Sequence, residues 1–261
     1  RLTANDSALS AYDELTVTVN TVPGRTWSES ADYYVDAQYG SDTNTGTSTS
    51  PFKTISKAIT VATAGKKVLV WGGGQTYSGA LTLSANGTSG SPITFKRDPS
   101  SGAAIIDGAG TTSGTLYSTG ATYTVIDGFT ITNGRYGVYL NGDGADNWTI
   151  KNCRITGNSY HGIYSRYGDN LTVNNCAIYL NGLNNYAAIY FYNGATNGTV
   201  TQCSLYRHDY GVWAAQSSTG TVVRDCIIAN HTGGGVLCET SSTAAITYSD
   251  VWNNYLNYSG C

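Results

Sequence analysis

The chain has 261 residues, only 12% of them charged, and a formal net charge of −3. Average globular proteins carry roughly twice that share of charged residues. The lack of a basic field argues against nucleic acid and anionic membranes as partners, and no apolar run reaches the roughly 18 residues of a membrane span. There is no methionine, so we expect the chain to be a piece of a longer precursor.

The first 20 residues predict two short strands joined by a turn. Apolar and polar residues alternate at Leu2–Thr3 and again over 15–19 (LTVTV), the pattern of half-buried strands. The segment resembles the last hairpin of a PKD or other immunoglobulin-like module of extracellular bacterial proteins. A hairpin alone is marginally stable in water, so we expect it to pack against the next domain, another chain or a neighbouring domain that is absent here. Residues 21–32, with Pro23 and Gly24, predict a linker to a second domain over 33–261.

A short helix is expected near the start of this second domain. Ile55, Ala58, Ile59 and Ala62 have the spacing of an amphipathic helix within residues 52–63. The repeat described in the next paragraph predicts that the following strands wind into a coil. The unpaired strand edge of the first turn of that coil would invite aggregation. We therefore expect the helix to cap that end of the coil.

A phrase recurs through the second half of the chain every 23 to 27 residues, as TIKNCRI, TVNNCAI, TVTQCSL and VVRDCII. A period of roughly 20–30 residues with short apolar strands and Asn/Gly corners predicts a parallel β-helix, whose turns lie about 4.8 Å apart. The cysteines of the phrase then stack inside the coil as free thiols. These are Cys153, Cys176, Cys203 and Cys226. Cys238 and Cys261 fall outside this ladder, and a disulfide between them is an alternative that we leave open.

Two columns of polar residues are expected at the corners of the coil. The first lies five residues after the cysteine position and contains Asn158, Asn181, His208, His231 and Asn254. The second contains Asn147, Asn170, Asn197 and Gly220. Stacked side chains of this kind bond to one another and to corner backbone groups that the bend leaves unpaired. We interpret both columns, including the two histidines, as structural.

The last strand of each turn predicts an aromatic row on one outer face. Side chains alternate across a strand, which points these residues inward: Val138, Ile163, Ile189, Val212 and Val236. Their neighbours then stack outward: Tyr139, Tyr164, Tyr190 and Trp213. Two residues farther along come Asn141, Arg166, Tyr192, Ala215 and Glu239.

An exposed aromatic row at this spacing suits a linear glycan. The alternative is that tyrosine stands there only because sheets favour aromatic residues. Residues 182–186 lengthen one corner beside the row, and His161 borders it one turn below. Insertions of this kind often edge a binding face.

From about Tyr33 to Gly134 the sequence resembles the opening segment of secreted right-handed β-helix proteins, including lyases of the pectate-lyase and chondroitinase-B type. The resemblance lies in YYVDAQYGSDTNTG, GTSGSPITFKRD and IIDG. It implies an extracellular or cell-surface location in a bacterium and a polysaccharide partner. Such lyases need a base for the C5 proton of a uronate, which implies Arg166 here, with Tyr164 and His161 as helpers. From the outward alternation, the candidate substrate-binding residues are Tyr139, Asn141, Tyr190, Tyr192, Trp213 and Glu239.

Lyases of this fold also need a cation, often Ca²⁺, to neutralise the sugar acid. Asp146 and Asp169 occupy equivalent corners one turn apart, so their like charges would be relieved by such an ion. Aspartate before asparagine is also ordinary turn chemistry, which is the interpretation that we favour. The family's catalytic set of clustered carboxylates cannot be recognised in the sequence, and whether the chain is an enzyme stays open.

Two functions therefore compete. The first is an extracellular domain that binds, and in one version cleaves, an acidic polysaccharide. The second is a structural or adhesive surface module without catalysis, which assembles through its strand edges when the N-terminal strands of one chain pair with the last turn of another. An acidic cluster on the outer face would favour the first.

Overall fold

The computed structural model describes residues 3–4, 13–14 and 24–261. Strand β1 (Thr3–Ala4) pairs antiparallel with β2 (Asp13–Glu14). The rest of the expected hairpin and residues 21–23 of the expected linker lie outside the described residues. The assignment of this segment to an immunoglobulin-like module stays a prediction.

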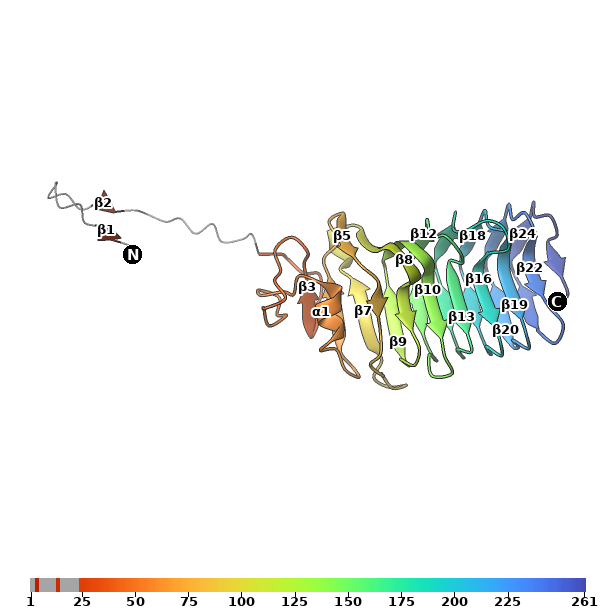
Figure 1. Cartoon of the computed structure of the whole chain (residues 1–261), viewed down its shortest axis with the longest axis horizontal. Helices are drawn as coiled ribbons and strands as arrows, with labels where there is room; N and C mark the ends of the chain where they lie inside the picture. The colour runs from red at the N-terminus through yellow and green to blue at the C-terminus, as the bar shows by residue number, and fades with distance from the viewer. Residues whose placement is uncertain (1–2, 5–12, 15–23) are drawn as a thin grey trace.

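Residues 33–261 form an elongated coil of parallel strands (Figure 1). One side of the coil is a nine-stranded sheet, here called sheet 1. Its strands are β3 (Tyr33–Val35), β4 (Lys67–Val70), β7 (Ile93–Arg97), β9 (Thr124–Asp127), β11 (Thr149–Lys151), β14 (Thr172–Asn174), β17 (Thr199–Thr201), β20 (Thr221–Arg224) and β23 (Ala244–Thr247).

The other two sides are the arms of one 14-stranded sheet. Both arms share β8 (Ala104–Ser118) and β10 (Thr130–Asn141), which are long enough to bend from one arm into the other. Arm A also contains β5 (Gln75–Ser78), β12 (Arg154–Thr156), β15 (Ala177–Tyr179), β18 (Ser204–Tyr206), β21 (Ile227–Ala229) and β24 (Asp250–Trp252). Arm B contains β6 (Leu81–Thr82), β13 (Ile163–Arg166), β16 (Ala187–Tyr192), β19 (Tyr210–Ala215), β22 (Gly234–Cys238) and β25 (Tyr258–Ser259). The predicted parallel β-helix is confirmed.

The interior of the coil is a single apolar core that runs its whole length. The inward positions predicted for arm B are all fully buried: Val138, Ile163, Ile189, Val212 and Val236. The four stacked cysteines are buried and free, as predicted. Each thiol lies 3.1 to 3.3 Å from the carbonyl oxygen two residues before it and 3.5 to 3.8 Å from a carbonyl oxygen of the preceding turn. The thiols therefore act as small core side chains that also satisfy backbone acceptors.

Cys238 and Cys261 form a disulfide across two adjacent turns, with 5.1 Å between their Cα atoms. The alternative left open by the sequence is thus the one that the structure adopts. Its geometric cause is the parallel pairing of β22 with β25, which sets Leu237 opposite Ser259 and brings the two cysteines close. The bond fastens the last turn to the turn before it.

Both polar columns are confirmed as structural ladders. In the first, Asn158 Nδ2 donates to Asn181 Oδ1 over 2.8 Å, and the backbone N–H of His208 donates to His231 Nδ1 over 3.2 Å. In the second, the asparagines have φ between 56° and 58°, and Gly220 has φ 71°. Asparagine and glycine adopt this left-handed region at the lowest cost, which explains why these two residue types occupy the corner.

The capping helix is shorter than expected. Helix α1 covers Ile55–Ile59, with Thr54 Oγ1 accepting from the backbone N–H of Lys57 at its start. The predicted span continued to residue 63, but Thr60 and Val61 are β-branched and disfavour helix. Ile55 and Ala58 are buried, so the helix still covers the first turns of the coil.

Part of the expected linker lies against the coil. Trp27 packs edge-on against Tyr34 and Trp71, with ring centroids 4.8 and 5.4 Å apart. Glu29 forms ion pairs with Lys67 and Lys96. Residues 24–32 therefore cross the strands β3, β4 and β7 on the outside of sheet 1.

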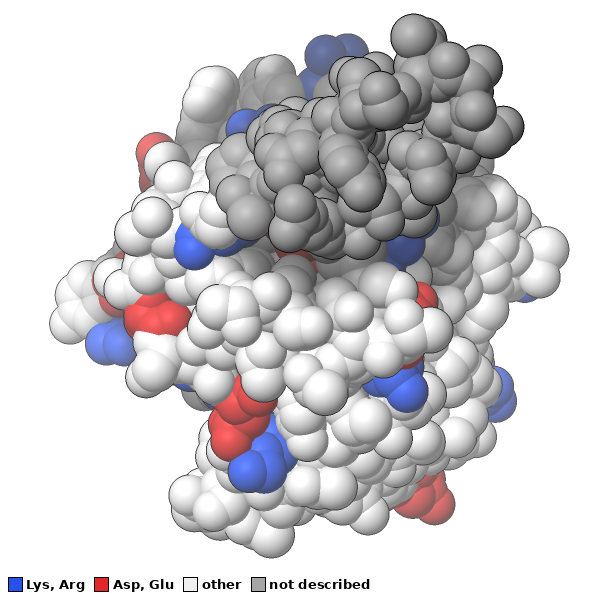
Figure 2. Space-filling view, turned by 90° about the vertical axis from the view of Figure 1, so that its left-hand side faces the viewer, with Lys and Arg blue, Asp and Glu red and all other residues white. Residues whose placement is uncertain are grey.

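Charged side chains of both signs are few on the part of the surface that Figure 2 shows, and uncharged residues make up most of it. No described helix is long and apolar enough to span a membrane.

Candidate functional site: an aromatic face on arm B

Arm B carries an unbroken column of aromatic side chains on its outer side. The parallel register pairs successive members one turn apart. The column contains Tyr117, Tyr139, Tyr164, Tyr190 and Trp213, with ring centroids 5.5, 5.0, 5.2 and 4.4 Å apart in that order. We call this column and the residues that flank it the aromatic face. Tyr117 was missed by sequence reasoning, although the phrase GTLYS at 114–118 repeats the pattern of the later turns.

The rings are less open than expected. The ring planes of Tyr139 and Tyr164 are nearly parallel, with an angle of 2° between them, and those of Tyr164 and Tyr190 differ by 12°. Stacking at this spacing covers the flat faces of the inner rings with their neighbours, and Tyr190 keeps only 8% of its surface exposed. An inner ring therefore presents its edge and its hydroxyl group to a ligand, rather than the open face that sugar stacking would need.

The second expected column is also on this face. The register pairs Asn141, Arg166, Tyr192 and Ala215 on successive turns. Arg166 contacts Asn141 Oδ1 at 3.5 Å and the Tyr167 hydroxyl at 3.3 Å, and its Nε has no hydrogen-bond partner. Glu239 lies just past the end of β22, where it accepts a hydrogen bond from Trp213 Nε1 over 3.1 Å.

His161 lies at the edge of the aromatic face, with its ring centroid 4.8 Å from that of Tyr190. Its Nδ1 accepts the backbone N–H of Ala187 over 2.9 Å. Tyr186, from the predicted insertion, packs at right angles to the imidazole and stacks on Tyr160 with 4.2 Å between centroids. The Arg135 guanidinium lies 4.2 Å above the Tyr160 ring. Arg135 was missed because it lies at the irregular bend inside β10, where the register shifts, and Tyr160 because it lies in a corner; strand alternation predicts neither direction.

The titration behaviour of this face follows from burial. Burial raises the pKa of both Tyr164 and Tyr190 well above the usual range, so their hydroxyls stay protonated and neutral. Burial also lowers the pKa of His161 to about 3. The pKa of Tyr160 is lowered by its contacts with the Tyr186 hydroxyl and then with Arg135.

The three residues that the resemblance implied as catalytic lie on one face but none is prepared to take a proton. The pKa of Arg166 is raised, chiefly by its contact with the Tyr139 hydroxyl. The pKa of Tyr164 is raised by burial, and the one lone pair of His161 is occupied by Ala187. A general base needs a pKa near the working pH, so the arrangement favours binding over proton abstraction.

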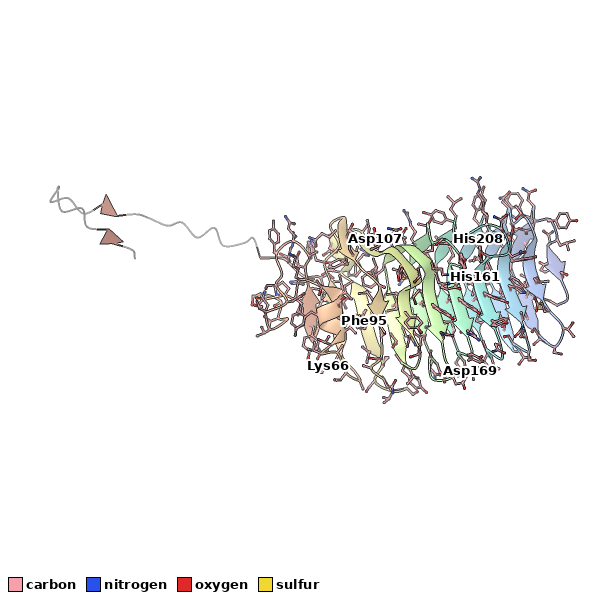
Figure 3. All side chains as sticks on the ribbon, in the orientation of Figure 1. Lys66, Phe95, Asp107, His161, Asp169 and His208 are labelled. Atoms are coloured by element: carbon pink, nitrogen blue, oxygen red, sulfur yellow. A yellow bond between two sulfur atoms is a disulfide. The ribbon has the colours of Figure 1, made fainter. Side chains whose placement is uncertain are left out.

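The proposed calcium corner does not fit a metal ion. Asp146 Oδ1 accepts the backbone N–H of Asp169 over 2.8 Å, and Asp169 Oδ1 accepts from the backbone N–H and the hydroxyl of Thr196 over 2.7 and 2.8 Å. Each carboxylate thus accepts a backbone hydrogen bond at the corner of the next turn. Figure 3 places Asp169 on the edge of the coil away from His161. Residues 24–261 hold no group of three or more potential metal ligands.

A cavity of about 830 Å³ lies beside the first turns, lined in part by Arg25, Trp27, Tyr34 and Asp36. Its charged groups already have partners, because Arg25 Nε is 2.7 Å from Asp36 Oδ2 and Glu29, which also lines it, pairs with Lys67 and Lys96. The acidic residues that border the aromatic face, Asp209 and Glu239, lie on separate turns and form no cluster. The described part of the chain therefore lacks the acidic cluster that would have favoured the polysaccharide function over the structural one.

Comparison with known proteins places the chain among β-helix proteins. The family model described as "right handed beta helix region" matches residues 114–261. A curated relative, the uncharacterized protein YwoF of Bacillus subtilis (strain 168), is 42% identical over 67 residues, which cover 26% of this chain and 14% of that protein.

Solved structures extend the likeness to most of the coil. The pectate lyase Pel9A has a TM-score of 0.69 at 20% identity, over 83% of this chain and 62% of that one. XylC in complex with xylose has a TM-score of 0.66 at 12% identity, over 86% and 66%. An alginate lyase from Paenibacillus sp. str. FPU-7 has a TM-score of 0.54 at 17% identity, over 79% and 95%. At these identities the likeness shows the fold, including its right-handed winding. The chain spans about three fifths of the pectate lyase and about one seventh of the curated relative.

Proposed function

Because the chain belongs to the right-handed β-helix family, whose model covers more than half of it, we propose that it is an extracellular polysaccharide-binding domain that uses the aromatic face of arm B. Solved structures with the same fold include a pectate lyase, an alginate lyase and a protein bound to xylose. The fold alone does not carry a function, so the proposal depends on the site.

The observation that carries it is the chemical character of the face. Protonated tyrosine hydroxyls and apolar ring edges repeat every 4.4 to 5.5 Å along the coil. A surface that alternates apolar rings with neutral donors matches a sugar chain, whose C–H patches alternate with hydroxyl groups. The stacked row is long enough to contact several sugar units in sequence.

Two guanidinium groups favour an acidic polysaccharide. Arg135 and Arg166 are both half-buried on this face, and neither forms an ion pair with any described carboxylate. Guanidinium groups match the two oxygens of a carboxylate with paired hydrogen bonds. The sugar acid would therefore supply the negative charge that the protein does not.

We propose binding without cleavage for this part of the protein. His161, Tyr164 and Arg166 lack a free basic atom at neutral pH, and the described residues offer no clustered carboxylates. A panel of oligogalacturonate, alginate and neutral xylo-oligosaccharide, measured by calorimetry and by the absorbance of unsaturated uronate, tests both parts. Saturable binding of an acidic oligosaccharide without new absorbance is expected. Failure of every acidic ligand to bind would overturn the proposal.

A second candidate function has its own observation. The last turn exposes several large apolar side chains, namely Tyr248, Trp252, Tyr255, Leu256 and Tyr258. Apolar surface of this kind often marks a contact with another protein, which favours a structural or adhesive module that self-associates. Light scattering of the chain with and without residues 1–20 tests it. Loss of oligomers on truncation supports pairing between chain ends, and a monomer in both forms contradicts it.

A further inference from the structure

We propose that His161 is a fixed, neutral hydrogen-bond donor that binds an oxygen atom of the polysaccharide through Nε2. This inference rests on the proposed function and adds the atom that would fix the position of the sugar chain along the row. It replaces the role of proton acceptor that the resemblance implied for this residue.

The position of His161 is set by its neighbours in the chain and across turns. Gly162 follows it, and a Cβ there would lie 2.5 Å from the Ile178 side chain and 2.6 Å from the Ala188 carbonyl oxygen. The backbone therefore packs tightly at this corner and holds the preceding imidazole in place. The ring is surrounded by aromatic side chains, with centroid distances of 4.8 to 5.9 Å to Tyr136, Tyr164, Tyr186 and Tyr190.

The hydrogen bond from Ala187 determines the tautomer. The backbone N–H of Ala187 points at Nδ1 from 2.9 Å, so Nδ1 must be the nitrogen without a proton. A neutral imidazole then carries its hydrogen on Nε2. Nε2 has no hydrogen-bond partner among the described residues, yet it is not one of the unpartnered atoms sealed from solvent. His161 keeps only 5% of its surface exposed, so Nε2 is a donor without an acceptor among the described residues at the small part of the ring that solvent reaches.

The surroundings keep the ring neutral. The titratable groups around it are the hydroxyl groups of four tyrosines and the imidazole of His208, with the Arg135 cation nearby. None is a carboxylate that would stabilise an imidazolium, and burial lowers the pKa of His161 to about 3. At neutral pH the ring is therefore uncharged and carries its proton on Nε2.

His231 shows what a structural histidine looks like in the same coil. Its Nδ1 accepts the backbone N–H of His208 over 3.2 Å, and its Nε2 lies 3.2 Å from the Leu205 carbonyl oxygen. Both ring nitrogens are used inside the protein, whereas His161 uses one and leaves the other for a ligand. The two residues form a matched pair for a test.

The experiment compares three variants in binding to the acidic oligosaccharide that the wild type prefers. His161→Gln keeps an acceptor for Ala187 and a donor toward the ligand, and its affinity should stay within about 2-fold. His161→Leu removes both groups, and its affinity should fall by roughly 3- to 10-fold, the range for one hydrogen bond. His231→Asn, which inserts the residue found elsewhere in that ladder, should bind as the wild type does. Equal binding by folded His161→Leu would overturn the proposal.

Nitrogen-15 NMR of the wild type gives a second readout that needs no variant. The free protein should show His161 as the Nε2–H tautomer, and the Nε2 resonance should shift when acidic oligosaccharide is added to saturation. A proton on Nδ1, or an Nε2 resonance that does not move in the saturated complex, would overturn the inference while leaving the proposed function intact. If no acidic oligosaccharide binds the wild type at all, both fail.

Discussion

Two outer faces of the same turns carry different side chains on the same kind of strand. On sheet 1 the register stacks Thr149, Thr172, Thr199 and Val222. On arm B the matching turns stack Tyr139, Tyr164, Tyr190 and Trp213. Beneath both columns the inward residues are equally buried and equally aliphatic, as Val173 and Ile163 show.

This difference between the two outer faces distinguishes residues that the fold requires from residues that a ligand would require. Threonine and valine satisfy the preference of a parallel strand for branched side chains on sheet 1. The coil therefore does not require aromatic residues on its outside, and their concentration on arm B calls for another reason. Of the two interpretations that the sequence left open, the comparison favours a binding face.

The largest effect is expected where the two faces share a core. Ile163→Asp would bury an unpaired charge beneath the aromatic face at a cost of several kcal/mol, and we expect loss of cooperative folding. The matched change on the outside of sheet 1, Thr172→Asp, should alter the free energy of unfolding by less than about 1 kcal/mol. Thermal and urea unfolding measure both. Equal destabilisation by the two changes would contradict the assignment of inside and outside.

Acid should destabilise the coil through its buried histidines. Burial lowers the pKa of His161 and His208 to about 3 and that of His231 to about 4. Below pH 6.5 the unfolded chain gains protons that the folded chain does not, so stability falls as the pH drops from about 6.5 toward 4. Each histidine contributes up to about 1.4 kcal/mol per pH unit within that window.

Variants of single histidines show which residue causes this pH dependence of stability. His161→Gln should flatten the dependence of the free energy of unfolding on pH, measured by urea unfolding at pH 7 and pH 5, and His231→Asn should do the same from the corner ladder. An unchanged slope in either variant would show that the removed residue titrates normally.

Ligand binding should distinguish the faces directly. Trp213 has a ring at the end of the aromatic column, and Trp213→Ala should weaken binding of an acidic oligosaccharide by about 1–3 kcal/mol through lost apolar contact. Thr199→Ala, on sheet 1, should leave the affinity unchanged. Calorimetry at constant salt measures both, and a larger loss for Thr199→Ala would move the binding site to the other face.

The smallest expected effect belongs to the guanidinium groups. Arg135→Gln and Arg166→Gln should each cost about 1 kcal/mol of binding to an acidic oligosaccharide, the scale for a partly exposed ion pair. The affinity for a neutral xylo-oligosaccharide, where it is measurable, should not change. Added salt should weaken the binding of the acidic oligosaccharide to the wild type more than to either variant. A loss of similar size for the neutral ligand would show that these residues act through packing instead.

The fold could be predicted because the coil repeats. A period of 23 to 27 residues keeps equivalent residues in register, so one cysteine position and one asparagine position define whole ladders. Departures from the repeat were harder to predict. The disulfide of Cys238 with Cys261 was left open because the two residues do not share the phrase of the ladder, and α1 is short because β-branched residues follow it.

The candidate site could be predicted only as a row. Alternation along a strand gives the side of the sheet on which Tyr164 and Tyr190 lie, but not the orientation of their rings, which hides the flat faces. Arg135 lies at the irregular bend of β10 and Tyr160 in a corner, where the backbone direction changes and strand alternation does not apply. The role of His161 depends on one hydrogen bond from Ala187, a contact between turns that the sequence does not show.

The most direct test of the binding face is an NMR titration of the wild-type chain with the acidic oligosaccharide, read at the tryptophan indole N–H groups. Trp213 Nε1 lies on the aromatic face, whereas Trp148 is fully buried and donates its Nε1–H to the Ala121 carbonyl oxygen over 2.6 Å. We predict that the Trp213 signal and the amides of β13 and β16 shift in a saturable way, while Trp148 and the amides of β14 and β17 stay in place. Shifts on sheet 1 without shifts on arm B would contradict the account.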